Sequence, residues 1–171
     1  MRIVIGTFYR TGSTWLFNAV RLSCIEAGLS VKVSGNMNLE DFDEDVCIHK
    51  IHLHSAEMER AADHVFTIER DLSDADASFL RAFGNPCDPA HRKKSLRAAM
   101  LWRKAAMHPF HFDDIKQNPM RILTGISIEL GLKFGSQDLI SVHSKLKALK
   151  PPTDKTQDPE SLYFSRHITS E

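Results

Sequence analysis

The spacing of hydrophobic and polar residues in this chain changes several times between a strand-like and a helical pattern. The first apolar run, Ile3-Val4-Ile5, is rich in β-branched residues and ends at Gly6, which is typical of a buried strand in a parallel sheet. In residues 14–27 the apolar positions recur at helical spacing, and Gly28 follows where helices often end in a left-handed residue. The N-terminal part therefore predicts a strand, a loop and a helix.

The same alternation continues through the rest of the chain. Residues 46–53 and 65–68 are predicted strands, and helices are predicted at residues 74–83, 97–107, 120–130 and 137–149. Pro151-Pro152 ends the last of these helices, and residues 153–159 predict an extended surface loop. Strands that alternate with helices pair in parallel through right-handed crossovers. We therefore expect a three-layer α/β/α fold with a central, mostly parallel sheet.

Composition limits the classes of protein to consider. The 171 residues, 42% of them hydrophobic, can form one packed core, so we expect a single domain over residues 1–171. Lys and Arg (22) balance Asp and Glu (22), which argues against a nucleic acid or an anionic membrane as partner. Any anion site must then be local.

The three cysteines, Cys24, Cys47 and Cys87, are odd in number and lack C-x-x-C spacing. This pattern argues against a disulfide framework and a structural zinc site, and it favours a reducing compartment. The N-terminus shows no leader-like pattern and no apolar run is long enough to cross a bilayer. We therefore expect a cytoplasmic protein.

The loop between the first strand and the first helix carries the clearest chemistry. It reads Phe8-Tyr9-Arg10-Thr11-Gly12-Ser13-Thr14-Trp15. Backbone N–H groups and the positive end of a helix converge at such a junction and favour an anion. Gly12 lets the backbone approach a ligand, Ser13 and Thr14 add hydroxyl groups, and Arg10 supplies a charge that can fork onto oxygens. The loop predicts a phosphate site, although a plain turn and helix cap would use similar residues.

The loop lacks the lysine of the Walker pattern G-x-x-x-x-G-K-[ST], which disfavours ATP or GTP hydrolysis. Residues 9–16 instead resemble the 5′-phosphosulfate loop of sulfotransferases, especially the bacterial form R-S-G-S-T-W-L. The resemblance implies a P-loop NTPase-like sulfotransferase fold with its core in residues 1–135, followed by a C-terminal helix and tail in residues 136–171. It also implies that Arg10, Thr11, Gly12, Ser13 and Thr14 bind 3′-phosphoadenosine 5′-phosphosulfate (PAPS). Trp15 could stack on the adenine, or it could belong to the core.

The second predicted strand ends in a group of polar residues. Strict alternation places Lys50, His52 and His54 on one face, and His49, Ile51 and Leu53 on the other. Lys50-Ile51-His52 resembles the K-x-H element of sulfotransferases, which implies that His52 is the catalytic base and that Lys50 and Arg10 stabilise developing charge. Imidazole suits this role because it titrates near neutral pH. A metal on His52 and His54 would lack further ligands on that face, so no metal is expected. The other alternative is that all three histidines lie at a solvated strand end.

The third predicted strand leads to Arg70, and Ser78 follows eight residues later. The same spacing in sulfotransferases implies that both residues hold the 3′-phosphate of the donor, although Arg70 could instead pair with Glu69, Asp71 or Asp74. Residues 112–119 and the helix that follows them also resemble the family. The family's closing element R-K-G-x-x-G-D-W is absent, and Arg166 is the candidate for its phosphate contact.

The basic run His91-Arg92-Lys93-Lys94, with Arg97 beyond it, either attracts an anionic acceptor or is a solvated start of a helix. The leading hypothesis is sulfuryl transfer from PAPS to a hydroxyl or amine of a small molecule or glycan, leaving adenosine 3′,5′-bisphosphate (PAP). The alternatives are a sulfotransferase-like protein that binds nucleotide without catalysis, and a P-loop nucleotide kinase.

Overall fold

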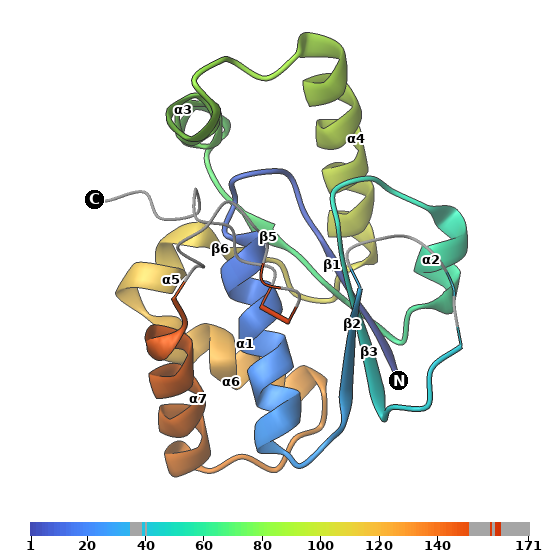
Figure 1. Ribbon diagram of the computed structural model, residues 1–171, viewed down its shortest axis with the longest axis vertical. Coiled ribbons are helices and arrows are strands. Elements are labelled where there is room, and N and C mark those ends of the chain that lie inside the picture. The colour runs from blue at the N-terminus through green and yellow to red at the C-terminus, as the bar shows by residue number, and fades with distance from the viewer. Residues whose placement is uncertain (35–38, 40, 151–157, 159, 162–171) are drawn as a thin grey trace.

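A computed structural model describes residues 1–34, 39, 41–150, 158 and 160–161. Its central sheet has four parallel strands in the order β2-β3-β1-β4 (Figure 1). They are β1 (Arg2–Gly6), β2 (Val31–Ser34), β3 (Val46–Ile51) and β4 (His64–Phe66). Strand β1 pairs with β3 on one side and with β4 on the other. The predicted parallel sheet is confirmed.

A second, two-stranded parallel sheet lies beyond β4 along the chain. It consists of β5 (Ile68–Glu69) and β6 (Phe110–His111), with Ile68 opposite Phe110. Thr67 separates β4 from β5, so the sequence-predicted strand at 65–68 is divided between two sheets. This division places Arg70 at the carboxyl end of β5.

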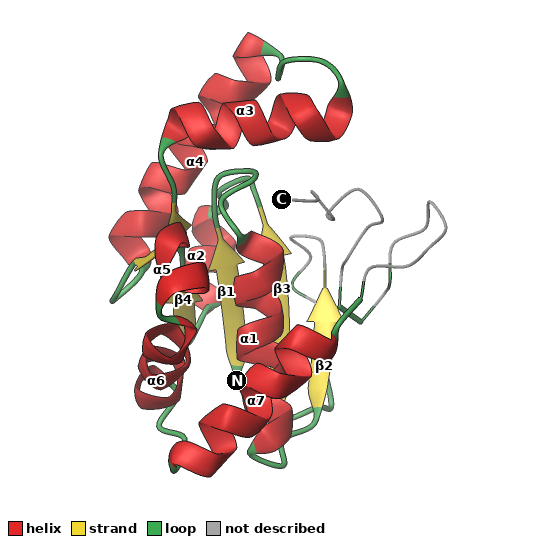
Figure 2. Ribbon diagram, turned by 90° about the vertical axis from the view of Figure 1, so that its left-hand side faces the viewer, coloured by secondary structure: helices red, strands yellow, loops and turns green. Residues whose placement is uncertain are grey.

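Helices cover both faces of the central sheet, and each face has its own hydrophobic core. On one face lie α1 (Ser13–Glu26), α6 (Pro119–Glu129) and α7 (Ser136–Ala148), which pack on side chains that include Ile3 and Ile5. On the other face lie α2 (Ala56–Ala61) and α4 (Pro89–Ala105). Their core contains Val4, Ile51, Met58, Val65, Trp102 and Ala106. Figures 1 and 2 show this three-layer arrangement.

Two helices lie near the carboxyl ends of the strands. Helix α3 (Leu72–Phe83) stands above the ends of β1 and β3 (Figure 2), and Ala75 and Phe79 of this helix pack with Phe8 and Tyr9. Helix α5 (Phe112–Gln117) follows β6 directly. Both helices therefore border the edge of the sheet at which parallel α/β folds bind ligands.

Several elements differ from the pattern-based expectation. Strands β2 and β6 and helices α2 and α5 were not predicted, because runs of two to six residues carry little periodicity. Strand β3 ends at Ile51 instead of residue 53. Helix α4 begins at Pro89, where Asp88 accepts a hydrogen bond from the backbone N–H of His91. The first turns of α4 are mostly basic and show no helical spacing of apolar residues, so the pattern predicts a helix only from residue 97.

In the described part of the chain, no helix is both long enough and apolar enough to span a membrane.

Candidate functional site

The loop between β1 and α1 contains two residues in the left-handed conformation and leads directly into a helix start. Arg10 and Gly12 both have left-handed φ angles, 58° and 91°. A side chain at position 12 would be strained at this φ, and its Cβ would lie 2.6 Å from Ile115 Cδ1. Helix α1 begins at Ser13 without a side-chain cap and without an acidic residue in its first turn. Its first N–H groups therefore lack a carboxylate partner of their own helix.

Lys50, near the end of β3, reaches the start of this helix. Its Nζ donates a hydrogen bond to Thr14 Oγ1 at 2.6 Å. Burial, together with the nearby charge of Arg10, lowers the pKa of Lys50 to about 8. The ammonium is thus held against the helix start at a free-energy cost that an opposite charge would offset.

His52 follows β3 directly and contacts Thr7, the residue that follows β1 at the start of the same loop. Its Nδ1 lies 3.0 Å from the carbonyl oxygen of Thr7. A carbonyl oxygen can only accept, so Nδ1 carries the proton and Nε2 keeps its lone pair. Burial lowers the pKa of His52 to about 4, and the charges of Lys50 and His91 contribute. The imidazole is therefore neutral at pH 7 and has a nitrogen that can accept a proton.

His54 does not join Lys50 and His52, and the expectation that the three side chains share one face is wrong. Its Nε2 pairs with Glu59 of α2, and its ring lies 4.7 Å from that of Trp102 in α4. The reason is that strand alternation ends with β3 at Ile51. In the described residues, no three His, Cys, Asp or Glu side chains are grouped so that they could hold a metal.

Arg70 and Ser78 come together with Arg10. Arg10 Nε donates to Ser78 Oγ at 3.1 Å, and Arg70 Nη1 donates to the carbonyl oxygen of Arg10 at 3.3 Å. The guanidinium of Arg70 also lies 3.9 Å from the centre of the Phe112 ring. The eight-residue spacing thus places both side chains at the loop.

Two of the three carboxylates close to Arg70 in sequence, those of Glu69 and Asp71, have other partners. Glu69 pairs with Arg103 of α4, and Asp71 caps α3 by accepting from the backbone N–H groups of Ser73 and Asp74. Among the residues that the structure describes, the buried Nε of Arg70 has no hydrogen-bond partner. The alternative that Arg70 is simply an ion-paired surface residue does not describe this arrangement.

Arg10, Lys50 and Arg70 thus form a group of cations around one loop. Burial, Arg70 and Arg81 each lower the pKa of Arg10. Within the described ranges, none of the three cations forms an ion pair with a carboxylate. Like charges that are gathered and not neutralised make a site for an anion with more than one charge.

Comparison with solved structures agrees with the α/β architecture described above. The crystal structure of mouse sulfotransferase SULT7A1 complexed with PAP matches the chain with a TM-score of 0.67 and 13% sequence identity. The match covers 96% of this chain and 75% of that one. This chain has the sulfotransferase fold. No family model matches the sequence, and no curated protein matches it either.

The fold match tests none of the residues that the resemblance assigns to the site. Trp15 is partly buried and packs against the core that α1, α6 and α7 share, so stacking on adenine stays a prediction. Arg166 lies outside the described residues.

In the basic run of α4, Lys93, Lys94 and Arg97 are exposed, whereas Arg92 pairs with Asp76.

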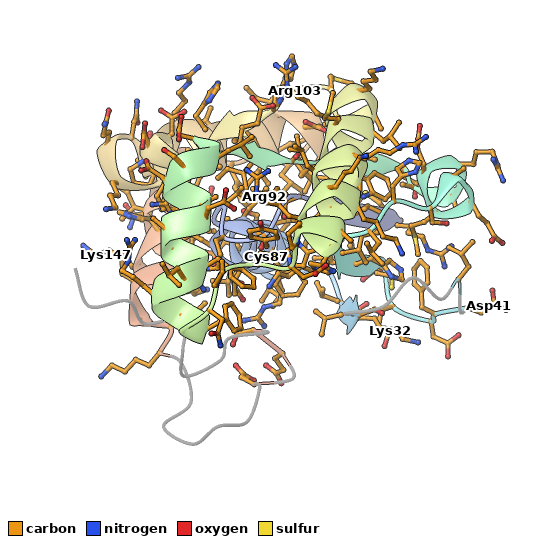
Figure 3. All side chains as sticks on the ribbon, turned by 90° about the horizontal axis from the view of Figure 1, so that it is seen from above. Lys32, Asp41, Cys87, Arg92, Arg103 and Lys147 are labelled. Carbon is orange, nitrogen blue, oxygen red and sulfur yellow. The ribbon has the colours of Figure 1, made fainter. Side chains whose placement is uncertain are left out.

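No local pattern in the sequence indicates the network that supports the β1–α1 loop. Tyr9 donates its hydroxyl hydrogen to Asp76 Oδ1 at 2.9 Å. Arg92 forks onto Asp76 with distances of 2.9 Å from Nε and 2.7 Å from Nη2 to Oδ2. Figure 3 shows Arg92 on the side of α4 that faces α3. One carboxylate thus joins the loop, α3 and α4.

The depressed pKa of His52 predicts how protein stability depends on pH. The folded-state value, about 4, lies below the ordinary value of 6.5, so the stability that neutral His52 contributes is complete above pH 6.5. It is lost as the pH falls from 6.5 to 4. Relative to the wild type, His52→Gln should therefore gain about 2 kcal/mol over this window. Urea unfolding at pH 7 and pH 4.5 measures the difference. The exposed His108→Gln is the control, and equal pH dependence of wild type and His52→Gln would contradict the prediction.

Proposed function

We propose that this protein transfers a sulfuryl group from PAPS to an acceptor hydroxyl or amine. The observation that carries the proposal is the group of partly buried cations around the β1–α1 loop, which form no ion pair within the described residues, with the neutral His52 hydrogen-bonded to Thr7 at the start of that loop. The sulfotransferase fold supports it, since a protein with that fold and a PAP ligand matches almost the whole chain. PAPS carries charged groups at the 5′ and 3′ positions of its ribose, and these suit cations that lie around one loop.

The donor would be held by two groups of residues. The helix start, with Thr11, Gly12, Ser13 and Thr14, offers N–H and hydroxyl donors to the 5′-phosphosulfate. Arg70 and Ser78 offer a guanidinium and a hydroxyl to the 3′-phosphate. Arg10, which contacts Ser78 and accepts from Arg70 through its carbonyl, lies between the two groups.

The reaction needs one proton transfer and one displacement. The acceptor oxygen or nitrogen attacks sulfur, and His52 Nε2 takes the proton that it loses. The bond between sulfur and the bridging oxygen breaks, and PAP leaves with the electron pair. Lys50 and Arg10 stabilise the charge that develops on the bridging oxygen, which is electrostatic catalysis by groups already in place.

Binding of PAP to the wild-type protein tests the donor, and Arg70→Ala and Ser78→Ala test the 3′-phosphate contacts. A lost charge-assisted hydrogen bond costs about 1.5–3 kcal/mol, so Arg70→Ala should weaken binding by roughly 10- to 100-fold and Ser78→Ala by less. Isothermal titration calorimetry gives the dissociation constants. Lys133→Ala, an exposed cation after α6, is the matched control. A wild-type protein that does not bind PAP would overturn the proposed donor.

The lowered pKa of Lys50 predicts how PAP binding depends on pH. Only its ammonium form attracts the anion, and the bound anion favours that form, so binding takes up a proton once the pH exceeds the free-state value of about 8. Affinity should fall by up to about tenfold per pH unit between pH 8 and 10. In Lys50→Met this decline should disappear and affinity at pH 7 should be lower. Titrations at several pH values test this, and an unchanged decline in the variant would exclude Lys50 as its cause.

The rate of sulfuryl transfer tests whether His52 is the catalytic base. His52→Ala should retain PAP binding and lose about 10²- to 10⁴-fold in the rate of transfer from labelled PAPS to a panel of phenols, alcohols, amines and glycans. His108→Ala should transfer at the wild-type rate. Full activity of His52→Ala would remove the proposed base. PAP binding without transfer to any acceptor would instead favour a nucleotide-binding protein without catalysis.

A further inference from the structure

The segment that carries His52 is no longer part of the sheet. The bond from the backbone N–H of Thr7 to the carbonyl of Ile51, at 3.3 Å, joins the ends of β1 and β3. His52, Leu53 and His54 then lead to α2, whose first residue is Ala56. The location of His52 therefore depends on contacts beyond the strand ladder.

The fully buried Trp102 of α4 supplies such contacts on the face opposite to α1. Its Nε1–H donates to the carbonyl oxygen of Leu53 at 3.0 Å, and its ring lies against that of His54. The indole also covers the end of β1, because a Cβ added to Gly6 would lie only 2.3 Å from Trp102 Cγ. A single side chain thus touches the residue after His52 and the residue before Thr7.

We propose that Trp102 is a positioning residue, which keeps His52 against the Thr7 carbonyl and thereby fixes the tautomer that leaves Nε2 as the proton acceptor. The catalytic meaning of this placement rests on the proposed function, whereas the placement itself can be measured without turnover.

Two features distinguish this role from ordinary packing. The other buried members of the same core, Val4, Ile51, Met58, Val65 and Ala106, carry no side-chain donor. The indole N–H is bonded to the backbone of the segment that carries His52. If that segment moved, the indole N–H and the Leu53 carbonyl would both lose their partner in a partly buried place, which is unfavourable for each group.

The pKa of His52 shows whether its segment stays in place, because this pKa depends on the surroundings of the imidazole. The carbonyl of Thr7 in the loop, Lys50 on β3 and His91 on α4 are the groups that act on its pKa beside burial. The pair of His54 and Glu59 lies two residues further along the segment. If the segment loosens, water reaches the imidazole and the pKa of His52 rises toward 6.5.

Trp102→Phe removes the N–H donor and leaves an aromatic ring in the core. An NMR titration of the His52 ring protons should show its pKa raised from about 4 by at least about one unit. In the transfer assay, kcat should fall by about tenfold or more while KM for PAPS stays near the wild-type value. The control Ile126→Ala removes a buried side chain from the opposite core and should lower the midpoint of urea unfolding without moving the pKa of His52.

A second variant covers the case in which Trp102→Phe does not fold. In a Trp15→Phe background, biosynthetic replacement of the remaining tryptophan by its benzothiophene analogue keeps the ring size and removes only the N–H. An unchanged pKa of His52 in either folded variant would overturn the positioning role. A wild-type protein that binds no PAP would overturn the proposed function instead, so the two failures are distinguishable.

Discussion

Repulsion among cations that are gathered at one loop is the constraint on which the rest of the site depends. Arg10 and Lys50 are both buried enough, and close enough to other cations, for their pKa values to be lowered. The fold holds them with neutral groups: Thr14 accepts from Lys50, Ser78 accepts from Arg10, and the Phe112 ring lies against Arg70. The charges therefore stay uncompensated within the described site, and a bound polyanion would relieve them.

The parallel sheet explains why residues from distant parts of the chain meet at this loop. The carboxyl ends of β1, β3 and β5 carry Thr7, His52 and Arg70, respectively, and parallel pairing brings the ends of β1 and β3 to one edge. The β1–α1 loop supplies the donors of a helix start at the same edge. The two cores, one on each face, hold this edge from both sides.

The sequence predicted the parts of this site that depend on local pattern. The strand, loop and helix at residues 3–27 have clear periodicity, and the position of Arg70 relative to Ser78 follows from a strand and a helix in succession. His54 was placed on the wrong face, because its direction depends on where β3 stops and on Glu59 and Trp102. The contacts of Trp102 with Leu53 and of Tyr9 with Asp76 span 49 and 67 residues, and no local pattern could indicate them.

The carboxylate of Asp76 also limits how this sequence can diverge. It accepts from Tyr9, 67 residues away, and from Arg92, 16 residues away, so three secondary-structure neighbourhoods share one acceptor. Loss of Asp76 would leave both Tyr9 and Arg92 without this acceptor, and loss of either donor would take one hydrogen-bond partner from the carboxylate. Among homologues, positions 9, 76 and 92 should therefore be inherited as a set and replaced together, an evolutionary coupling that arises from a single side chain.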